Sequence, residues 1–345
     1  MGSIDYIGLD VHKRTISYCA KDVSGEVLDQ GKIRATKEAL RGWAEARERE
    51  WIGGMEATMF TGWIYDELRP YAKALKVAHP QMVEAIVVGK KKNDRVDASM
   101  LADLLRCSLL PECYMLPAEL RHLRRVLRFR NLLVALAVKM RNRIAGILME
   151  VGAEYESGRL HGRAYFQDLL GTLEDVPESA IEILQLSRET LEFVERMQKQ
   201  LVRGLREDPE LSERVGRLMT IPGVGQITAL TWALEIGDPE RFSSIRKAVS
   251  YCGLCSDEKE SAGKRRRGPL SKKRNAHLQT VLIEAGKLAP RHNPQLKAIY
   301  DGQKEKGADW NQATVAVARK LVSYLLAVDK RQTDFVPQPL PAAAG

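Results

Sequence analysis

The run Ile4-Asp5-Tyr6-Ile7-Gly8-Leu9-Asp10, close to the start of the 345-residue sequence, decides the predicted fold. Its β-branched and aromatic residues predict a strand, and residues 14–20 form a second run of the same kind. Ser24-Gly25 supplies a turn before a third run at about 26–33. The three runs predict a three-strand meander.

Helices and strands alternate after the meander. We expect a helix at about 36–50, a strand at 51–57, a helix at about 60–74 and a brief strand at 75–78, followed by further helix. Strands followed by alternating helices and strands give a mixed sheet with helices on its faces. The sequence therefore predicts an α/β domain over residues 1–115.

The pattern changes at about residue 116 to one long helix that runs to about 150. Between Glu119 and Glu150 it contains eight Lys or Arg residues and no Asp or Glu. A second helical stretch, about 178–207, has apolar residues at the spacing of a coiled-coil seam. We expect the two helices to pair, within one chain or between chains, and we assign residues 116–210 to a basic coiled-coil region with a partly helical connection at about 152–177. The apolar positions of the second helix are Leu191, Val194, Leu201 and Leu205.

Asp208-Pro209 marks a boundary, after which the sequence is again mostly helical. The predicted interruptions include the turn Ile221–Gly225 and a loop from Gly253 to Arg274. We predict a C-terminal domain over 211–335 and a disordered, Pro/Ala-rich tail over 336–345.

The composition points to a polyanionic partner, because the formal net charge is +9. The five cysteines are an odd number without framework-like spacing, which favours free thiols in a reducing compartment. We find no leader and no run of 18 apolar residues, so we expect a cytoplasmic protein that does not enter a membrane.

Four carboxylates could converge on one metal site. Asp10 closes the first strand and Glu56 the fourth, while Asp94 and Asp97 are three apart and share one face of a helix. Converging carboxylates suit a hard cation such as Mg²⁺ or Mn²⁺, which can position a phosphodiester for cleavage. Carboxylates are also common at strand and helix ends, where Asp94 would interact with the positive helix pole.

Other polar residues near this site have simpler interpretations. His12 and Lys13 follow the first strand and could reach a phosphate, although such residues more often begin a polar turn. Asp103 lies on a different face of the helix from Asp97, so we leave it out of the site.

The segment 253–268 places a serine beside a run of cations. Ser261 shortly precedes Lys264–Arg267, and cations around a serine can hold a phosphate and stabilise the charge of its transition state. Ser256 is a rival candidate in the same loop. The alternative is a solvated basic loop that binds nucleic acid passively.

Two smaller motifs are ambiguous. Residues 221–229 resemble the hairpin of a helix-hairpin-helix module, in which Gly223 and Gly225 would let backbone N–H groups approach a phosphate, although a tight turn between packed helices fits equally well. Cys252 and Cys255 have the spacing of a zinc half-site, but no second pair follows, so we treat them as packing residues.

The order of these features resembles RNase H-like folds of the RuvC resolvase kind. More narrowly, Gly8–Lys13 and Lys92–Ala98 resemble the DEDD-type insertion-sequence transposases, which are bridge-RNA-guided recombinases. The C-terminal features of that family are matched by Ser261, Gly263, Lys264–Gly268, Lys272 and Asn275–Leu278.

The resemblance implies a DNA recombinase with a RuvC-like metal nuclease domain, a helical coiled-coil insertion and a serine-bearing transposase domain. It implies that Mg²⁺ or Mn²⁺ is held by Asp10, Glu56, Asp94 and Asp97, and that Ser261 forms a covalent 5′-phosphoserine link to DNA in a site shared between subunits. The implied partners are donor DNA, target DNA, an element-encoded bridge RNA and further copies of the chain, as dimers that pair into a tetramer.

Two alternatives stay open at this point. One is a Mg²⁺-dependent Holliday-junction nuclease of RuvC type that uses water, and the other is a non-catalytic nucleic-acid-binding protein. Nucleic-acid contact is predicted for Arg121, Arg124, Arg125, Arg128, Gly223, Gly225, Lys264, Arg265, Arg266, Arg267, Lys272, Lys273 and Arg274.

Overall fold

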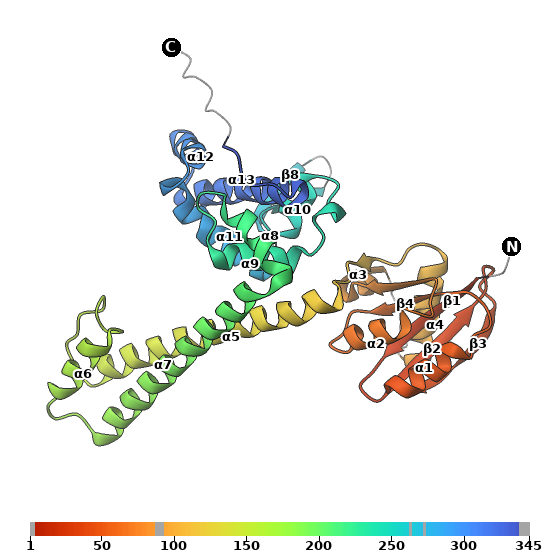
Figure 1. Ribbon diagram of the computed structural model, residues 1–345, viewed down its shortest axis with the longest axis horizontal. Helices are drawn as coiled ribbons and strands as arrows, with labels where there is room; N and C mark the ends of the chain where they lie inside the picture. The colour runs from red at the N-terminus through yellow and green to blue at the C-terminus, as the bar shows by residue number, and fades with distance from the viewer. Residues whose placement is uncertain (1–3, 87–92, 262–263, 272–273, 338–345) are drawn as a thin grey trace, which may run out of the picture. The chain divides into compact units, whose positions relative to one another are not determined.

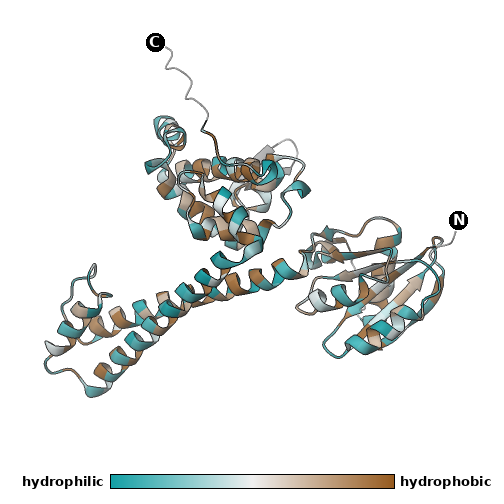
Figure 2. Cartoon of the chain, in the orientation of Figure 1, coloured by the Kyte–Doolittle hydropathy of each residue, from teal (hydrophilic) through white to brown (hydrophobic). Residues whose placement is uncertain are grey.

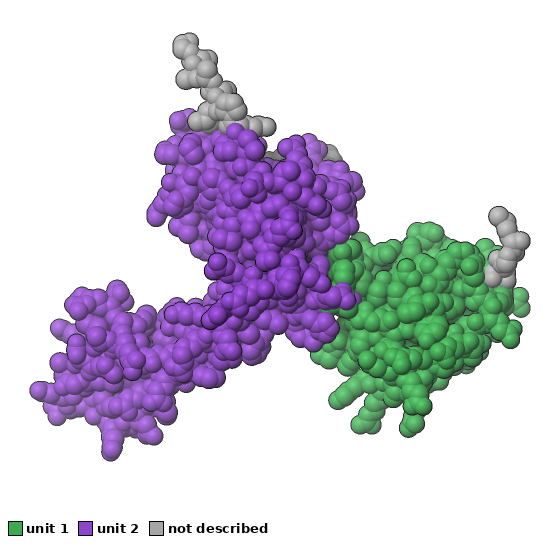
Figure 3. Space-filling view, in the orientation of Figure 1, with its two compact units in different colours: residues 1–118 green, residues 119–345 purple. Residues whose placement is uncertain are grey.

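The computed structural model describes residues 4–86, 93–261, 264–271 and 274–337, with the backbone alone for 257–261 and 264–267. The chain divides into two compact units, residues 1–118 and 119–345 (Figure 3). No helix within the described ranges is both long and apolar enough to cross a membrane.

Unit 1 is built on a six-stranded mixed sheet in the order β3-β2-β1-β4-β5-β6 (Figure 1). The predicted meander is confirmed, because β1 pairs antiparallel with β2 and β2 with β3, whereas β4 lies parallel to β1 and β5 parallel to β4. The short strand β6, which we did not predict, pairs antiparallel with β5. The strands are β1 (Asp5–Val11), β2 (Thr15–Lys21), β3 (Val27–Arg34), β4 (Trp51–Glu56), β5 (Ala74–Ala78) and β6 (Glu112–Cys113).

One face of this sheet carries the main core of unit 1. Leu9 and Met55, on neighbouring strands, pack there with apolar residues of α1 (Lys37–Glu45) and α2 (Thr61–Leu68). Both helices are shorter than the predicted 36–50 and 60–74. Arg69 still has helical dihedral angles and bonds back to Tyr65, but Pro70 after it has no N–H to continue the helix.

The opposite face is covered by α4 (Asp94–Arg106), which follows α3 (Pro80–Ile86). Gly8 permits this packing, since a Cβ atom there would lie 2.0 Å from the carbonyl oxygen of Ala98. The side chain of Asn93 accepts a hydrogen bond from the N–H of Val96 and caps the helix. The first turn of α4 is thereby fixed above the sheet.

Unit 2 contains two long helices, α5 (Ala118–Glu150) and α7 (Glu178–Glu207), as the sequence predicts. They lie side by side within the one chain, and their apolar residues form a core with those of α6 (Arg163–Gly171), which lies in the predicted connection (Figure 1). Hydrophobic and hydrophilic residues alternate along both long helices (Figure 2). Leu191 and Val194 are buried in this core, as their spacing indicates.

The remainder of unit 2 surrounds α9 (Gln226–Ile236), whose residues 228–236 are all buried. Around it pack α8 (Pro209–Met219), α11 (Ala276–Leu288) and α13 (Trp310–Arg331). The other helices are α10 (Ile245–Tyr251), α12 (Pro294–Glu305) and the short 3₁₀ helices η1 (Pro239–Arg241) and η2 (Ala289–Arg291).

The prediction that residues 253–274 form a loop without secondary structure is wrong. Two strands occupy it, β7 (Ser256–Ser261) and β8 (Lys264–Leu270), paired antiparallel. The strand β7 has no β-branched or aromatic residue, so propensity gave no signal, and backbone hydrogen bonding forms the hairpin. Residues 338–345 of the predicted tail lie outside the described residues.

Candidate functional site

The register of the sheet places Asp10 and Glu56 at the same level. Leu9 pairs with Met55 across the parallel strands, and Asp10 and Glu56 are the next residue on each strand. Because side chains alternate along a strand, both carboxylates project from the face opposite the buried Leu9 and Met55. This is the face that α4 covers, as the contact at Gly8 shows.

The same row of residues continues across β2 and β3. Asp10 pairs with Ser17, and Ser17 pairs with Lys32. Paired residues share a face of the sheet, so Lys32, Ser17, Asp10 and Glu56 form one row beneath the first turn of α4.

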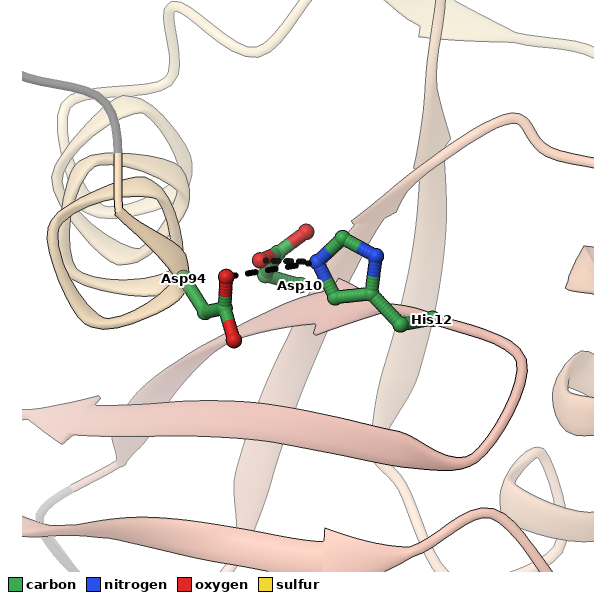
Figure 4. Close-up of side chains that lie close together, drawn as sticks. All are labelled: Asp10, His12 and Asp94. Atoms are coloured by element: carbon green, nitrogen blue, oxygen red, sulfur yellow. Dashed lines mark hydrogen bonds and ion pairs between the residues drawn. The ribbon is translucent and has the colours of Figure 1, made fainter.

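Asp94 begins α4 and brings a third carboxylate to this row. The His12 Nε2 atom lies 3.0 Å from Asp10 Oδ2 and 3.6 Å from Asp94 Oδ1 (Figure 4). One ligand atom from each of these three side chains lies within 4.8 Å of the others, which makes this the candidate metal-binding group among the described residues. Lys32 Nζ lies 3.0 Å from the other oxygen of Asp94.

The pKa values of Asp10 and Asp94 are shifted in opposite directions. Burial raises the pKa of Asp10, His12 opposes that rise, and the charges of Asp97 and Asp94 add to it. Asp94 is more exposed, and its hydrogen bond from Lys32 lowers its pKa. Asp10 therefore carries a negative charge that the protein alone does not fully stabilise, and a bound cation would stabilise it.

The donor set fits a divalent cation. Carboxylate oxygens are the ligands that Mg²⁺ and Mn²⁺ prefer, and an imidazole is compatible with Mn²⁺. The hydroxyl of Ser17, buried directly beside Asp10 in the row, has no hydrogen-bond partner in the structure. Asp10 and Asp94 would hold the cation, with His12 beside them.

The other two predicted carboxylates lie near this group without belonging to it. Glu56 shares the row and the edge of the sheet with Asp10. Asp97, one helical turn after Asp94, acts on Asp10 through its charge. The ion pair of Asp103 with Lys21, 2.5 Å between Nζ and Oδ2, is consistent with leaving Asp103 out.

Sequence reasoning gave His12 and Lys32 too little weight. The sequence leaves His12 open between a phosphate contact and a polar turn, yet its position two residues after Asp10 is a usable signal, since residues i and i+2 of an extended chain tend to share a side. Lys32 had no comparable signal, because its neighbours follow only from the register of β3 against β2.

The serine-bearing segment lies in unit 2. Ser261 ends β7 and pairs with Lys264 at the start of β8. Its side chain lies outside the described residues, as do those of Lys264–Arg267 and the whole of Lys272 and Lys273. The rival Ser256 begins β7.

The arginines of α5 differ in their surroundings. Arg128 donates two hydrogen bonds of 2.8 Å to Glu235, whose carboxylate is fully buried and also accepts one of 2.8 Å from Asn275. Arg124 is half-buried, and burial lowers its pKa. Arg125 is exposed. Arg128 thus has a role within unit 2, whereas Arg125 is available to a partner.

The glycines of the turn at 221–225 have different roles. Gly223 has a φ of +95°, and a Cβ atom there would lie 2.6 Å from that of Ala289. Gly225 caps α9, and a Cβ atom there would meet nothing within 4 Å. Close packing and the positive φ explain why position 223 is a glycine, whereas a side chain at position 225 would face open space.

The five cysteines are free, as predicted. Burial raises the pKa of Cys252 to about 12, which disfavours the thiolate that a zinc ligand requires.

Comparisons with known proteins identify the family. Residues 7–152 match a family model of DEDD transposases of the IS110 type, and residues 215–301 match the model described as "Transposase IS116/IS110/IS902 family". The chain belongs to the IS110 family of DEDD transposases. It is therefore an enzyme that acts on DNA, and the predicted resemblance is confirmed.

Relatives of this transposase agree with that assignment. The transposase for insertion sequence element IS1111A of Coxiella burnetii is 24% identical over 345 residues, which cover 97% of this chain and 92% of the relative. A probable family 20 transposase of Pseudomonas aeruginosa is 25% identical, over 79% of this chain and 81% of the relative. A pilin gene-inverting protein of Moraxella bovis is 26% identical over 37% of this chain and 40% of the relative.

Proposed function

We propose that this transposase cuts and rejoins DNA, with Mg²⁺ or Mn²⁺ held by Asp10, Glu56, Asp94 and Asp97. The observation that carries the proposal is the group Asp10–His12–Asp94, whose ligand atoms lie within 4.8 Å of one another at the edge of the sheet. When bound, the cation would polarise the scissile phosphate. Asp10 and Asp94 would bind it directly, and the hydrogen bond between His12 and Asp10 would orient the Asp10 carboxylate. Glu56, level with Asp10 in the sheet, and Asp97, whose charge acts on Asp10, would complete the ligand set.

Ser261 is the proposed nucleophile. Its hydroxyl oxygen attacks the phosphorus and loses its proton, a 5′-phosphoserine bond forms, and the bond from phosphorus to the 3′ oxygen breaks, leaving a protonated 3′-OH. The adjacent Lys264–Arg267 run supplies positive charge for the phosphate. Rejoining reverses these steps with another 3′-OH. The support for Ser261 is its position in the family's motif.

The proposed partners are donor DNA, target DNA and an element-encoded bridge RNA, on dimers that pair into a tetramer. The net charge of +9 and the exposed Arg125 on α5 support a nucleic-acid partner. We also propose that unit 2 contains two domains, 116–210 as a coiled-coil region and 211–335 as the transposase domain. The division is supported by one hydrophobic core that draws only on residues 133–201, although Leu127 and Leu205 of the long helices pack into the other core.

The test is to trap a covalent protein–DNA adduct on element-end DNA with the cognate RNA and to map the attached residue. Wild-type protein should give an adduct at Ser261, while Ser261→Ala and Asp10→Asn should give none. Ser256→Ala is the matched control and should behave as wild type.

Two other outcomes would change the proposal. An adduct at Ser256 would show that the serine assignment is wrong. Cleavage without any adduct, retained in Ser261→Ala and lost in Asp10→Asn, would instead support a RuvC-type nuclease that uses water.

A further inference from the structure

Lys32 holds one oxygen of a carboxylate that the metal would need. Its Nζ atom lies 3.0 Å from Asp94 Oδ2, while the other oxygen of Asp94 faces His12 at 3.6 Å. Both oxygens of Asp94 therefore face a nitrogen. A cation in the Asp10–His12–Asp94 group would approach Asp94 from the side of Oδ1, and the charge of Lys32 on the same carboxylate would oppose it. A cation that used both oxygens of Asp94 would displace the ammonium group of Lys32.

The Lys32 side chain is free to move after such a displacement. Lys32 is 60% exposed and Asp94 40% exposed, so neither group is enclosed by the fold. A lysine ammonium is a compact charge on a flexible stem, with three donors and no acceptor. A divalent cation beside Asp94 would repel it, and a DNA phosphate is a suitable new partner.

A second contact holds α4 in place without Lys32. Arg95, the residue after Asp94, donates a 2.8 Å hydrogen bond to Gln30, two residues before Lys32 on β3. The first turn of the helix is therefore attached to this strand twice, and only the Lys32 contact uses a proposed metal ligand.

We propose that Lys32 is a positioning residue that competes with the metal for Asp94 and moves to a DNA phosphate when the metal binds. The inference rests on the proposed metal site. It makes metal binding and DNA binding cooperative: DNA removes the competitor from Asp94, and by linkage the metal releases Lys32 to DNA.

The test measures Mn²⁺ binding to the full-length protein by isothermal titration calorimetry, with and without a non-cognate 20-bp duplex. Without DNA, Lys32→Met should bind Mn²⁺ roughly two- to five-fold more tightly than wild type, the range of an exposed ion pair. Adding DNA should raise the Mn²⁺ affinity of both proteins, and the ratio of the affinity with DNA to the affinity without DNA should be smaller for Lys32→Met than for wild type. Lys32→Arg should restore wild-type behaviour.

Lys73→Gln is the matched control. Lys73 forms an ion pair with Glu50, with 2.7 Å between Nζ and Oε2, and it is 48% exposed. Both residues precede their strands, at the end of the sheet away from Asp10. This variant removes the same charge and one comparable ion pair, so it should leave Mn²⁺ affinity unchanged.

The possible failures are distinguishable. If wild type binds no Mn²⁺, the metal site and this inference both fail. If wild type binds Mn²⁺ but Lys32→Met matches Lys73→Gln, competition is excluded and the metal site stands. Weaker Mn²⁺ binding by Lys32→Met would also overturn the inference.

Discussion

The absent side chain of Gly8 and the carbonyl oxygen of Ala98 determine how closely α4 approaches the sheet. A Cβ atom on Gly8 would lie 2.0 Å from that oxygen and 2.5 Å from the backbone nitrogen of Ala102. Both contacts are with helical backbone, which cannot rotate away as a side chain can. The approach of α4 brings Asp94 to Asp10, so the proposed metal site requires a residue without a side chain at position 8.

Gly8→Ala should therefore displace α4 and weaken Mn²⁺ binding. We expect a loss of about 1–3 kcal/mol in the free energy of unfolding, the usual range for overpacking. The fraction of the wild-type Mn²⁺ binding free energy that is lost should exceed the fraction of the unfolding free energy that is lost. Urea unfolding and calorimetry measure the two quantities. Gly42→Ala is the control: a Cβ atom at Gly42 on α1 meets nothing within 4 Å, and alanine should stabilise that helix by up to about 1 kcal/mol.

Removing the metal should lower the melting temperature of the wild-type protein. A ligand that binds only the folded state stabilises it by about 2.7 kcal/mol at 100 times its Kd. Scanning calorimetry in Mn²⁺ and then in EDTA measures this difference. Asp10→Asn should greatly reduce the difference, because it replaces a charged carboxylate of the proposed ligand set with a neutral amide. An unchanged Mn²⁺ effect in Asp10→Asn would place the metal elsewhere.

Arg128→Met should destabilise unit 2 by about 1–3 kcal/mol, since the buried Glu235 carboxylate loses two hydrogen bonds from a guanidinium that is 45% exposed and keeps the one from Asn275. In the wild type, burial raises the pKa of Glu235, but hydrogen bonds from Arg128 and Asn275 outweigh it and lower the pKa. The contribution of Glu235 is then present above its ordinary pKa, near 4.3, and is lost as the pH falls through the lowered folded value.

In the Arg128→Met variant, burial should instead raise the pKa of Glu235. The stability gap to wild type should therefore be largest near pH 7 and narrow as the pH falls towards 4, which melting curves across that range measure. Arg125→Met is the control, because Arg125 is exposed: it should keep stability and weaken DNA binding. Equal destabilisation by Arg128→Met and Arg125→Met would contradict the assignment of a structural role to Arg128 and of a DNA-binding role to Arg125.

The two glycines of the 221–225 turn should separate packing from nucleic-acid contact. Gly223→Ala should destabilise the protein, because the position combines a φ of +95° with a 2.6 Å approach to Ala289. Gly225→Ala should change stability by less than about 1 kcal/mol, and it should weaken duplex binding if the first N–H groups of α9 contact phosphate. Melting and fluorescence anisotropy give the two readouts.

The parts of the site that depend on local pattern could be predicted from the sequence. Asp10 is the second-last residue of a strand with clear β-propensity, and Asp94 lies three residues before Asp97 on a helix capped by Asn93. These rules concern neighbours along the chain, so they place each carboxylate on its element. The order of elements then indicates that the elements meet.

The parts that depend on pairing register could not be predicted. Lys32 reaches Asp94 because Lys32 pairs with Ser17, which places it in the row beneath α4. A bulge between Ala20 and Lys21 shifts the register of β2 against β3. No count of residues along the chain yields that alignment. The hairpin of β7 and β8 was missed for a related reason, since its polar sequence has no apolar alternation.

The parallel pairing of β1 with β4 also limits which length changes the protein can accept. Deleting one residue within β4 ahead of Glu56 would turn that carboxylate toward the core, and deleting two would keep its face but move it by about 6.6 Å. Insertions in the connections alter neither relation. Natural or engineered variation in length should therefore accumulate between the strands, while the spacing inside them is maintained to the single residue.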